Sequence, residues 1–175
     1  ENISLEVIGS LMNLPEKDIV TGIEVSEILT WRDDLASLVN VKFPKVLLFE
    51  ELVLKLKKMA LLPNIASFNK KIWVHVHCHQ KALSNQKVTF DILNLPLNYK
   101  PTIITSGCCG MAGSFGFEKD TYEVSMQIGE LKLFPAIRKF ENETIISANG
   151  TSCRHQIKDG TKKEAFHPVT ILRKA

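Results

Sequence analysis

The chain has 175 residues, of which 45% are hydrophobic and 23% are charged, the balance of an ordinary globular protein. This length predicts one domain that can bury a core without disulfide bonds. Charged residues interrupt every apolar run after a few positions, so no segment approaches the roughly 20 apolar residues of a membrane span, and no signal-peptide pattern is present. The net charge of +3 is small and the basic residues are scattered, which argues against nucleic acid as a partner.

Patterns in the first third of the chain predict mainly helices. Ser26 is expected to cap a helix in which apolar residues recur at helical spacing. The expected elements, in chain order, are an opening helix with Leu5, Ile8, Leu11 and Met12 that ends at Leu14-Pro15, a strand over 18–23, the helix with Ile28, Trp31, Leu35 and Leu38, a loop over 39–44, and an amphipathic helix with Phe49, Leu52, Leu56 and Met59 on one face.

The rest of the chain alternates β-branched runs with helical patterns. Strands are expected at 72–76, 102–105 and 144–148, and helices over 87–95, from a capping box of Asp120 and Glu123 to Phe134-Pro135, and from Pro168 onward. Alternation of this kind predicts an α/β fold with helices on both faces of a mostly parallel four-stranded sheet.

The four cysteines are the feature that indicates chemistry. Cys78 follows the run 72–76, Cys108 and Cys109 follow 102–105, and Cys153 follows 144–148. Sites in parallel sheets form beyond the carboxyl ends of the strands, so the four thiols are expected to meet at one edge of the sheet. Such convergence is what a metal site needs, because its ligands lie within about 2.3 Å of the ion.

Glycines around the cysteine pair favour a functional loop over simple packing. They recur at every third position and suit tight turns and close approach to a ligand: Gly107, Gly110, Gly113 and Gly116. Neither phosphate-loop pattern, G-x-G-x-x-G nor G-x-x-x-x-G-K-[ST], is present, so phosphate binding is not expected.

Histidines accompany the thiols. His75, His77 and His79 alternate, and if the strand ends near His77, then His77 and His79 lie beside the Cys78 thiol. Their roles could be metal ligand, imidazolium that stabilises a thiolate, or proton relay, although a hydrogen-bonded loop role is favoured for any single histidine. His155, two residues after Cys153, is the reserve ligand.

Other uses of the cysteines stay open from the residues alone. A disulfide between Cys108 and Cys109, or between Cys78 and Cys153, would be transient and redox-active in a reducing compartment. Nothing in the sequence marks export, so a reducing cytoplasmic setting is expected. A nucleophilic Cys/His pair ranks low, because it leaves three cysteines without a role.

Several motifs resemble the cysteine-rich CCG domain. They are H-C-H-Q-K-A-L (77–83), G-C-C-G-M-A-G-S-F-G (107–116) and G-T-S-C-R-H-Q-I (150–157), with Y-E-V-S-M-Q-I-G-E (122–130) and L-F-P-A-I-R (133–138) between them. The resemblance covers 72–172 and, more weakly, 22–34. It is nearest to the carboxy-terminal region of FAD-linked oxidases of the D-lactate dehydrogenase and glycolate oxidase type. More distant relatives are the iron–sulfur subunit of anaerobic glycerol-3-phosphate dehydrogenase and the subunit designated B of heterodisulfide reductase.

The resemblance implies a redox or electron-transfer accessory module with an iron–sulfur cluster, or zinc in some domains, held by Cys78, Cys108, Cys109 and Cys153. His77, His79, His155 and Gly110 would then support or replace these ligands. FAD would lie in a flavin-binding domain or subunit outside this chain. The whole protein would oxidise a 2-hydroxy acid and pass electrons to a membrane-associated quinone pool or another acceptor, from the cytoplasm or the inner face of the membrane.

The chain starts at Glu1 and not at Met, in what reads as the middle of a helix, so a fragment of a longer protein is expected. Residues 1–60 would form a lead-in that is the tail of a preceding repeat, and 61–175 the cysteine-rich domain, together a carboxy-terminal fragment of a longer protein. Such a fragment is not expected to turn over substrate, and no catalytic residue is assigned to it. Two alternatives stand beside this hypothesis: a structural zinc or interaction domain without a redox role, and a thiol–disulfide enzyme that uses Cys108 and Cys109.

Two positions depart from the family pattern. Gln156 stands where a C-x-x-C ending would supply a further thiolate, and Glu27 stands at the cysteine of an E-P-S-C motif whose proline is Val25 here. The ferredoxin run C-x-x-C-x-x-C-x-x-x-C-P is also missing. These departures predict a site of four thiolates and leave the choice of metal open.

Overall fold

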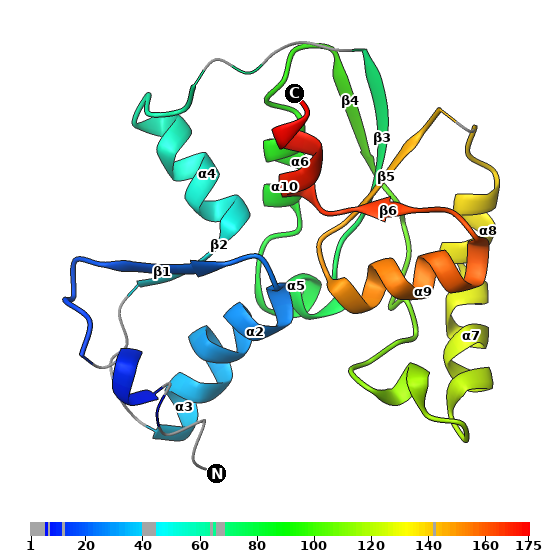
Figure 1. Cartoon of the computed structure of the whole chain (residues 1–175), viewed down its shortest axis with the longest axis horizontal. Coiled ribbons are helices and arrows are strands. Elements are labelled where there is room, and N and C mark those ends of the chain that lie inside the picture. Colours follow the sequence, from blue (N-terminus) through cyan, green and yellow to red (C-terminus); the bar gives the residue numbers. More distant parts are fainter. Residues whose placement is uncertain are drawn as a thin grey trace.

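Two parallel β-sheets organise the chain (Figure 1). The computed structural model describes residues 6, 8–11, 13–39, 45–63, 65, 69–141 and 143–175. The larger sheet has the order β4-β3-β5-β6, and the smaller one pairs β1 with β2. Their bounds are β1 (Ile19–Gly22), β2 (Lys45–Leu48), β3 (Lys70–His75), β4 (Tyr99–Ile103), β5 (Ile145–Ala148) and β6 (Ala165–Phe166).

The large sheet confirms the predicted α/β class with its four parallel strands. Ile72 on β3 is in register with Pro101 on β4 and with Ile145 on β5, so β3 lies at the centre of the sheet. Pro101 is tolerated because β4 is an edge strand, where a missing N–H breaks no ladder bond. The predicted strand at 18–23 belongs to the small sheet, and β6 takes the fourth place in the large one.

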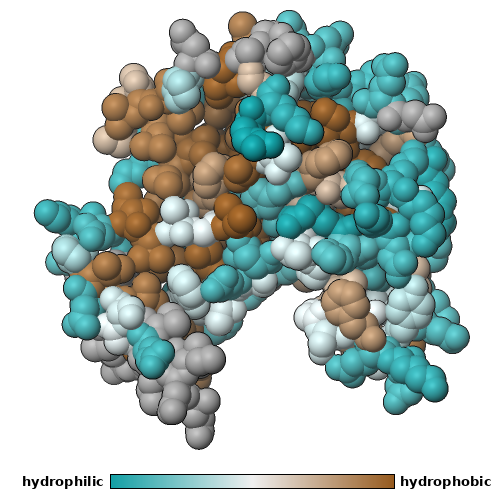
Figure 2. All heavy atoms as spheres, viewed as in Figure 1, coloured by the Kyte–Doolittle hydropathy of each residue, from teal (hydrophilic) through white to brown (hydrophobic). Residues whose placement is uncertain are grey.

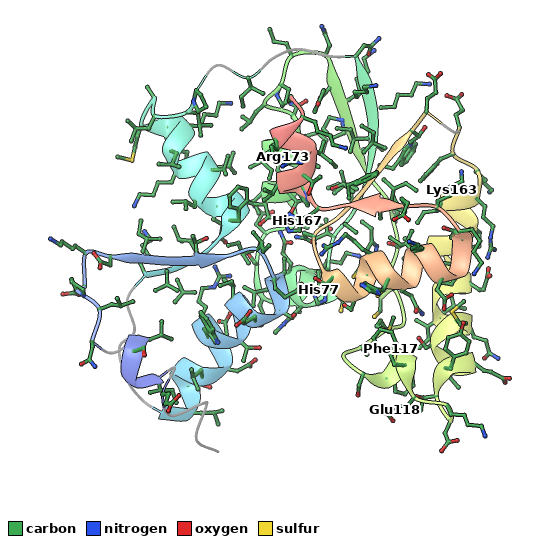
Figure 3. All side chains as sticks on the ribbon, viewed as in Figure 1. His77, Phe117, Glu118, Lys163, His167 and Arg173 are labelled. Atoms are coloured by element: carbon green, nitrogen blue, oxygen red, sulfur yellow. The ribbon has the colours of Figure 1, made fainter. Side chains whose placement is uncertain are left out.

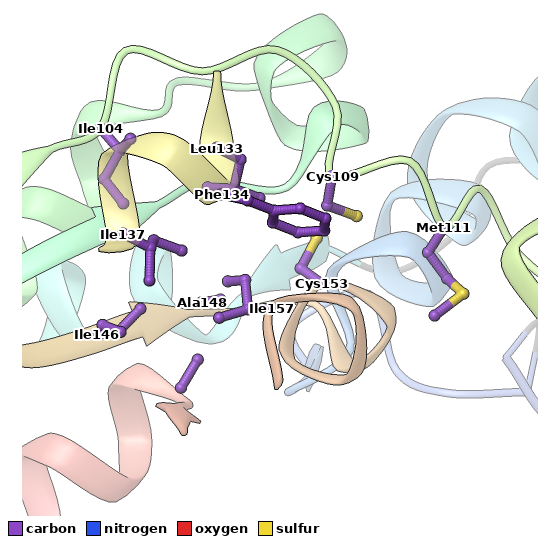
Figure 4. Close-up of a cluster of buried hydrophobic side chains, with 11 residues drawn as sticks. Ile104, Cys109, Met111, Leu133, Phe134, Ile137, Ile146, Ala148, Cys153 and Ile157 are labelled. Carbon is purple, nitrogen blue, oxygen red and sulfur yellow. The ribbon is translucent and has the colours of Figure 1, made fainter. Parts of the chain in front are cut away.

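Helices cover both faces of the large sheet (Figure 1). One apolar cluster joins β3 to α4, α6 and α10, and the other joins β5 to α8 and α9 (Figure 4). The helices are α2 (Val25–Leu29), a π-helical turn (Thr30–Leu35), α3 (Ala36–Val39), α4 (Phe49–Lys58), α5 (Cys78–Leu83), α6 (Lys87–Leu93), a 3-10 turn (Phe115–Phe117), α7 (Tyr122–Leu131), α8 (Leu133–Arg138), α9 (Thr151–Thr161) and α10 (Pro168–Arg173).

Three predicted helix boundaries are wrong. Glu24, not Ser26, is the N-cap of α2, and the Ser26 hydroxyl donates to the Glu24 carboxylate at 2.9 Å. Helix α7 begins after Thr121 without the capping box expected from Asp120 and Glu123. Pro135 does not end a helix but lies in the first turn of α8, where N–H groups have no intrahelical partner anyway.

Several elements were not predicted. They are β2, α5, α9 and β6, so Cys78 and Cys153 lie at the starts of helices instead of in loops. Of the predicted opening helix, residues 8–11 are helical, whereas Leu5 and Met12 lie outside the described residues. The predicted loop at 39–44 likewise falls largely on residues that are not described.

Candidate metal centre

The four cysteines gather at the carboxyl edge of the large sheet, as predicted. Cys78 is the first residue of α5 after β3, Cys108 and Cys109 follow β4, and Cys153 lies in the first turn of α9 after β5. All four thiols are free. Parallel strands end at the same edge, and this topology brings together residues that are up to 75 positions apart in the sequence.

The sulfurs divide into two pairs. The Sγ atoms of Cys78 and Cys108 are 3.9 Å apart, and both residues are partly exposed. Cys109 and Cys153 are 3% and 1% exposed and belong to the apolar cluster on the β5 side, where Figure 4 shows their sulfurs close together. The site therefore has a solvent-facing half and a buried half.

His75 completes the buried half, although sequence reasoning did not select it. A ring nitrogen of His75 and the sulfurs of Cys109 and Cys153 all lie within 4.8 Å of one another. The Nδ1 atom lies 2.9 Å from the Ser106 hydroxyl, whereas the buried Nε2 atom has no nitrogen or oxygen partner among the described residues. Buried polar atoms without a partner are rare in folded proteins, so Nε2 is an available ligand atom.

The predicted supporting histidines have other partners. His77 is the N-cap of α5 (Figure 3): its Nδ1 accepts from the His79 N–H at 3.2 Å, and its own N–H donates to Asn149 Oδ1 at 3.2 Å. His79 Nε2 lies 3.9 Å from a carboxylate oxygen of Asp34. His155 is exposed on α9 and meets the ring edge of Phe117, with the ring centroids 6.4 Å apart. The structure thus places His77 and His79 at the rim of the site and His155 outside it.

Two glycines let backbone approach the sulfurs. Gly110 has φ of +102°, and its N–H donates to Cys108 Sγ at 3.3 Å, as expected for a backbone donor in this loop. A Cβ at Gly110 would lie 2.1 Å from the Ser125 carbonyl oxygen. A Cβ at Gly150 would lie 2.3 Å from the His77 ring and 3.3 Å from Cys153 Sγ. Any side chain at either position would push apart the segments that form the site.

Hydrogen bonds between the cysteine sulfurs shift the pKa values of the four thiols in opposite directions. Hydrogen bonds from Cys109 and Cys78 lower the pKa of Cys108, and a hydrogen bond from Cys109 together with the nearby His75 ring lowers the pKa of Cys153 despite its burial. The same contacts, together with burial, raise the pKa values of Cys78 and Cys109. The thiols of Cys108 and Cys153 are therefore the ones that lose their protons more readily, and a thiolate is the form that binds a metal ion.

Lys81 supplies positive charge beside the sulfurs. It lies within the motif H-C-H-Q-K-A-L (77–83), but no role was assigned to it from the sequence. Its Nζ atom donates to the carbonyl oxygens of Ser106 at 2.7 Å and Gly107 at 3.0 Å. Burial lowers the pKa of Lys81, while the neighbouring thiolates oppose this shift. The ammonium thereby fastens the segment before Cys108 to helix α5.

Carboxylates from the first half of the chain hold the segment before Cys153. Glu24 accepts from the Thr151 N–H at 3.0 Å and from the Thr151 hydroxyl at 2.7 Å. Burial acts to raise the pKa of Glu24, but these hydrogen bonds outweigh it and the pKa is lowered. Glu50, which is 2% exposed, accepts from Asn149 Nδ2 at 3.0 Å. Desolvation raises the pKa of Glu50.

The two positions that depart from the family pattern lie in different environments. Gln156 is fully buried, and its Nε2 donates to the Ser125 hydroxyl at 2.8 Å and to the Ser125 carbonyl at 3.2 Å. Gln156 therefore fixes helix α7 against α9 beside Gly110. Glu27 is exposed on α2.

A cleft of about 650 Å³ opens over the solvent-facing half of the site. Its walls come from the start of α2, the start of α5, the loop after β4 and the start of α9, and they include Glu24, His79 and Arg154. Figure 2 shows the surface hollowed between the lobe that carries α2 and α3 and the lobe that carries α7. Among the described residues no helix is both long and apolar enough to cross a bilayer.

Comparison with known proteins finds similarity to dehydrogenases. The chain is 32% identical over 108 residues to the subunit designated C of the anaerobic glycerol-3-phosphate dehydrogenase of Escherichia coli K12. The matched stretch is 60% of this chain and 26% of that protein. It is 38% identical over 69 residues to D-2-hydroxyglutarate dehydrogenase of the same strain, which covers 39% of this chain and 7% of that protein.

The longer matches are weaker. D-2-hydroxyglutarate dehydrogenase of Pseudomonas putida is 27% identical over 156 residues, which covers 87% of this chain and 15% of that protein. The chain thus spans about a quarter or less of the curated relatives it matches. No protein-family model matches the chain, and no solved structure matches it at a significant level. The expected similarity to anaerobic glycerol-3-phosphate dehydrogenase is confirmed, and membership of the CCG family stays a prediction.

Proposed function

We propose that the chain is a metal-binding, electron-transferring module of a FAD-linked oxidoreductase. Its metal ligands would be Cys78, Cys108, Cys109 and Cys153, with the Nε2 atom of His75 beside them. The observation that carries this proposal is the buried meeting of a ring nitrogen of His75 with the sulfurs of Cys109 and Cys153, next to the Cys78 and Cys108 pair. Packing alone gives no reason to bury an imidazole nitrogen that finds no nitrogen or oxygen partner within the described part of the chain.

The donor set fits an iron–sulfur cluster. Four thiolates suffice as protein ligands for such a cluster, which when bound would accept and release an electron. The Gly110 N–H is already directed at Cys108 Sγ, and hydrogen bonds to ligand sulfurs tune a cluster's potential. Lys81 would offset part of the negative charge of the thiolates.

The similarity to dehydrogenases supports a redox role. Relatives named as dehydrogenases of glycerol-3-phosphate and of D-2-hydroxyglutarate match this chain over 108 and 69 residues. A flavin-binding domain or subunit would deliver electrons from a 2-hydroxy acid, and a quinone or another acceptor would receive them. These substrates and partners belong to the whole protein, of which residues 61–175 would be the cysteine-rich domain.

A structural zinc domain is the second candidate, and His75 favours it. Zinc sites commonly mix thiolate and imidazole ligands, and Ser106 would hold the His75 ring through Nδ1 in the way that partners of zinc-bound histidines do. In this case the site would stabilise the fold and the cleft without carrying electrons.

Metal content and colour separate the two candidates. The chain is purified without oxygen, its iron, sulfide and zinc are measured, and its visible spectrum is recorded before and after dithionite. Several irons with a band that dithionite bleaches support the electron-transfer proposal, and one zinc in a colourless protein supports the structural one. A chain that takes up neither metal after reconstitution overturns both. Cys109→Ser should lose the metal, whereas the matched control His155→Ala should retain it.

A further inference from the structure

Solvent access distinguishes the two sulfur pairs. Cys78 and Cys108 both line the cleft of about 650 Å³ and are partly exposed. Cys153 does not line this cleft, and although Cys109 borders it, Cys109 is only 3% exposed. A small molecule in the cleft therefore meets Cys78 and Cys108 first.

The local structure also keeps this pair close. Their Sγ atoms are 3.9 Å apart, and a disulfide bond of about 2.05 Å requires them to approach by about 2 Å. Cys108 lies on a segment without helix or strand between β4 and the 3-10 turn, so its side chain can turn without breaking a ladder or helix bond. Lys81 lies one helical turn after Cys78, and its ammonium group donates hydrogen bonds to the carbonyl oxygens of Ser106 and Gly107. These hydrogen bonds keep the segment that carries Cys108 close to Cys78.

We infer that Cys78 and Cys108 form an intramolecular disulfide when the metal-free chain meets a low-molecular-weight disulfide such as glutathione disulfide. One cysteine thiolate attacks a sulfur of the oxidant, which forms a mixed disulfide and releases one glutathione thiolate. The other cysteine then attacks the protein sulfur of the mixed disulfide and releases the second glutathione. Two protein thiols are oxidised by two electrons, and one glutathione disulfide is reduced to two glutathione molecules.

The other pairings are disfavoured by geometry or by access. Adjacent Cα atoms are about 3.8 Å apart across a trans peptide, below the range of about 4.4–6.8 Å found in disulfides, which disfavours a bond between Cys108 and Cys109. Cys109 and Cys153 are close to each other but buried among apolar side chains, out of reach of a charged oxidant. Cys153 is equally screened from pairing with Cys78.

The disulfide would control metal loading. This consequence rests on the proposed function, whereas the disulfide itself does not. Oxidation removes two thiolates and leaves His75, Cys109 and Cys153, which are too few for an iron–sulfur cluster held by four thiolates. Reduction by a thiol would restore the complete set. The cleft-facing pair thereby makes metal uptake depend on the local thiol–disulfide balance.

Peptide mapping tests the pairing directly. The metal-free chain is incubated with glutathione disulfide, free thiols are blocked with N-ethylmaleimide, and trypsin fragments are analysed by mass spectrometry. Residues 72–81 hold Cys78, residues 88–119 hold Cys108 and Cys109, and residues 140–154 hold Cys153. We expect a cross-link between 72–81 and 88–119 with fragmentation that assigns it to Cys108. Fragment 140–154 should carry a blocked thiol.

Other patterns would overturn the inference. They are a cross-link that contains 140–154, a bond within 88–119, glutathione adducts alone, or four blocked thiols. Cys109→Ser and Cys153→Ser are matched controls that should keep the cross-link, whereas Cys108→Ser should lose it. Metal uptake is measured separately on the reduced chain. A chain that forms the cross-link but takes up no metal therefore refutes the proposed function alone, and one that takes up metal but pairs other cysteines refutes this inference alone.

Discussion

Replacing Gly110 with alanine should destabilise the metal-free chain more than any other glycine change in the cysteine loop. Its φ of +102° disfavours a residue with a Cβ by about 1–2 kcal/mol. The new Cβ would also lie 2.1 Å from the Ser125 carbonyl oxygen, and because this oxygen belongs to helix α7, the backbone must move to relieve the contact. Overpacking of this kind costs about 1–3 kcal/mol, so we expect a loss of about 2–5 kcal/mol in total.

Gly113→Ala is the matched control for this change. Gly113 has a positive φ of +67°, but nothing lies within 4 Å of its Cβ position, so this variant should lose only the backbone contribution of about 1–2 kcal/mol. The assay is urea unfolding of both variants and the parent chain under identical metal-free, reducing conditions. If Gly110→Ala is no less stable than Gly113→Ala, then the close approach of the loop to α7 is not a feature of the folded protein.

Three further predictions concern the surroundings of the site. His75→Ala should weaken zinc binding by about tenfold to a hundredfold in competition with a chromophoric chelator, as loss of a ligand or of its orienting contacts does, and unchanged affinity would remove His75 from the site. Glu50→Gln should be more stable than the parent by a margin that grows as pH rises above about 4.5. The pKa of Glu50 is raised in the folded state, so the ionised carboxylate makes the parent chain less stable as pH rises. Unfolding of both chains at pH 5 and pH 7 measures this difference in free energy, and a difference that does not change with pH would contradict the prediction. Lys81→Met should slow the formation of the disulfide between Cys78 and Cys108 several-fold in a thiol-loss assay, and an unchanged rate would show that the contacts of Lys81 with Ser106 and Gly107 do not hold the pair together.

The sequence was sufficient to predict the convergence of the cysteines, because the rule behind it is topological. Once β3, β4 and β5 are parallel, the residues that follow them must meet at one edge, whatever their separation in the sequence. Helix boundaries were harder to predict from the sequence. The N-terminal residue Thr151 of α9 is bound by Glu24, which lies 127 positions earlier, so no local capping signal marks the helix that carries Cys153.

Neither His75 nor Lys81 was selected as a site residue from the sequence. The strand ends at His75, one residue before the expected end at Val76, and His75 itself lies on the strand and not in the loop beside Cys78. Strand alternation could have indicated it, since His75 shares a face with Trp73, which packs on the cluster containing Cys109 and Cys153. Lys81 acts through carbonyl oxygens 25 and 26 residues away, and such contacts leave no sequence pattern.

The hydrogen bonds of Glu24 and Glu50 make the two parts of the chain thermodynamically linked. Glu24 holds Thr151 and Glu50 holds Asn149, on either side of Gly150 and immediately before Cys153. Any ligand that binds at the sulfurs and orders this segment must therefore also favour the docked state of α2 and α4, and docking must strengthen binding by the same factor. A shorter chain that begins at residue 61 would lack both carboxylates, so its metal affinity would report the size of this coupling.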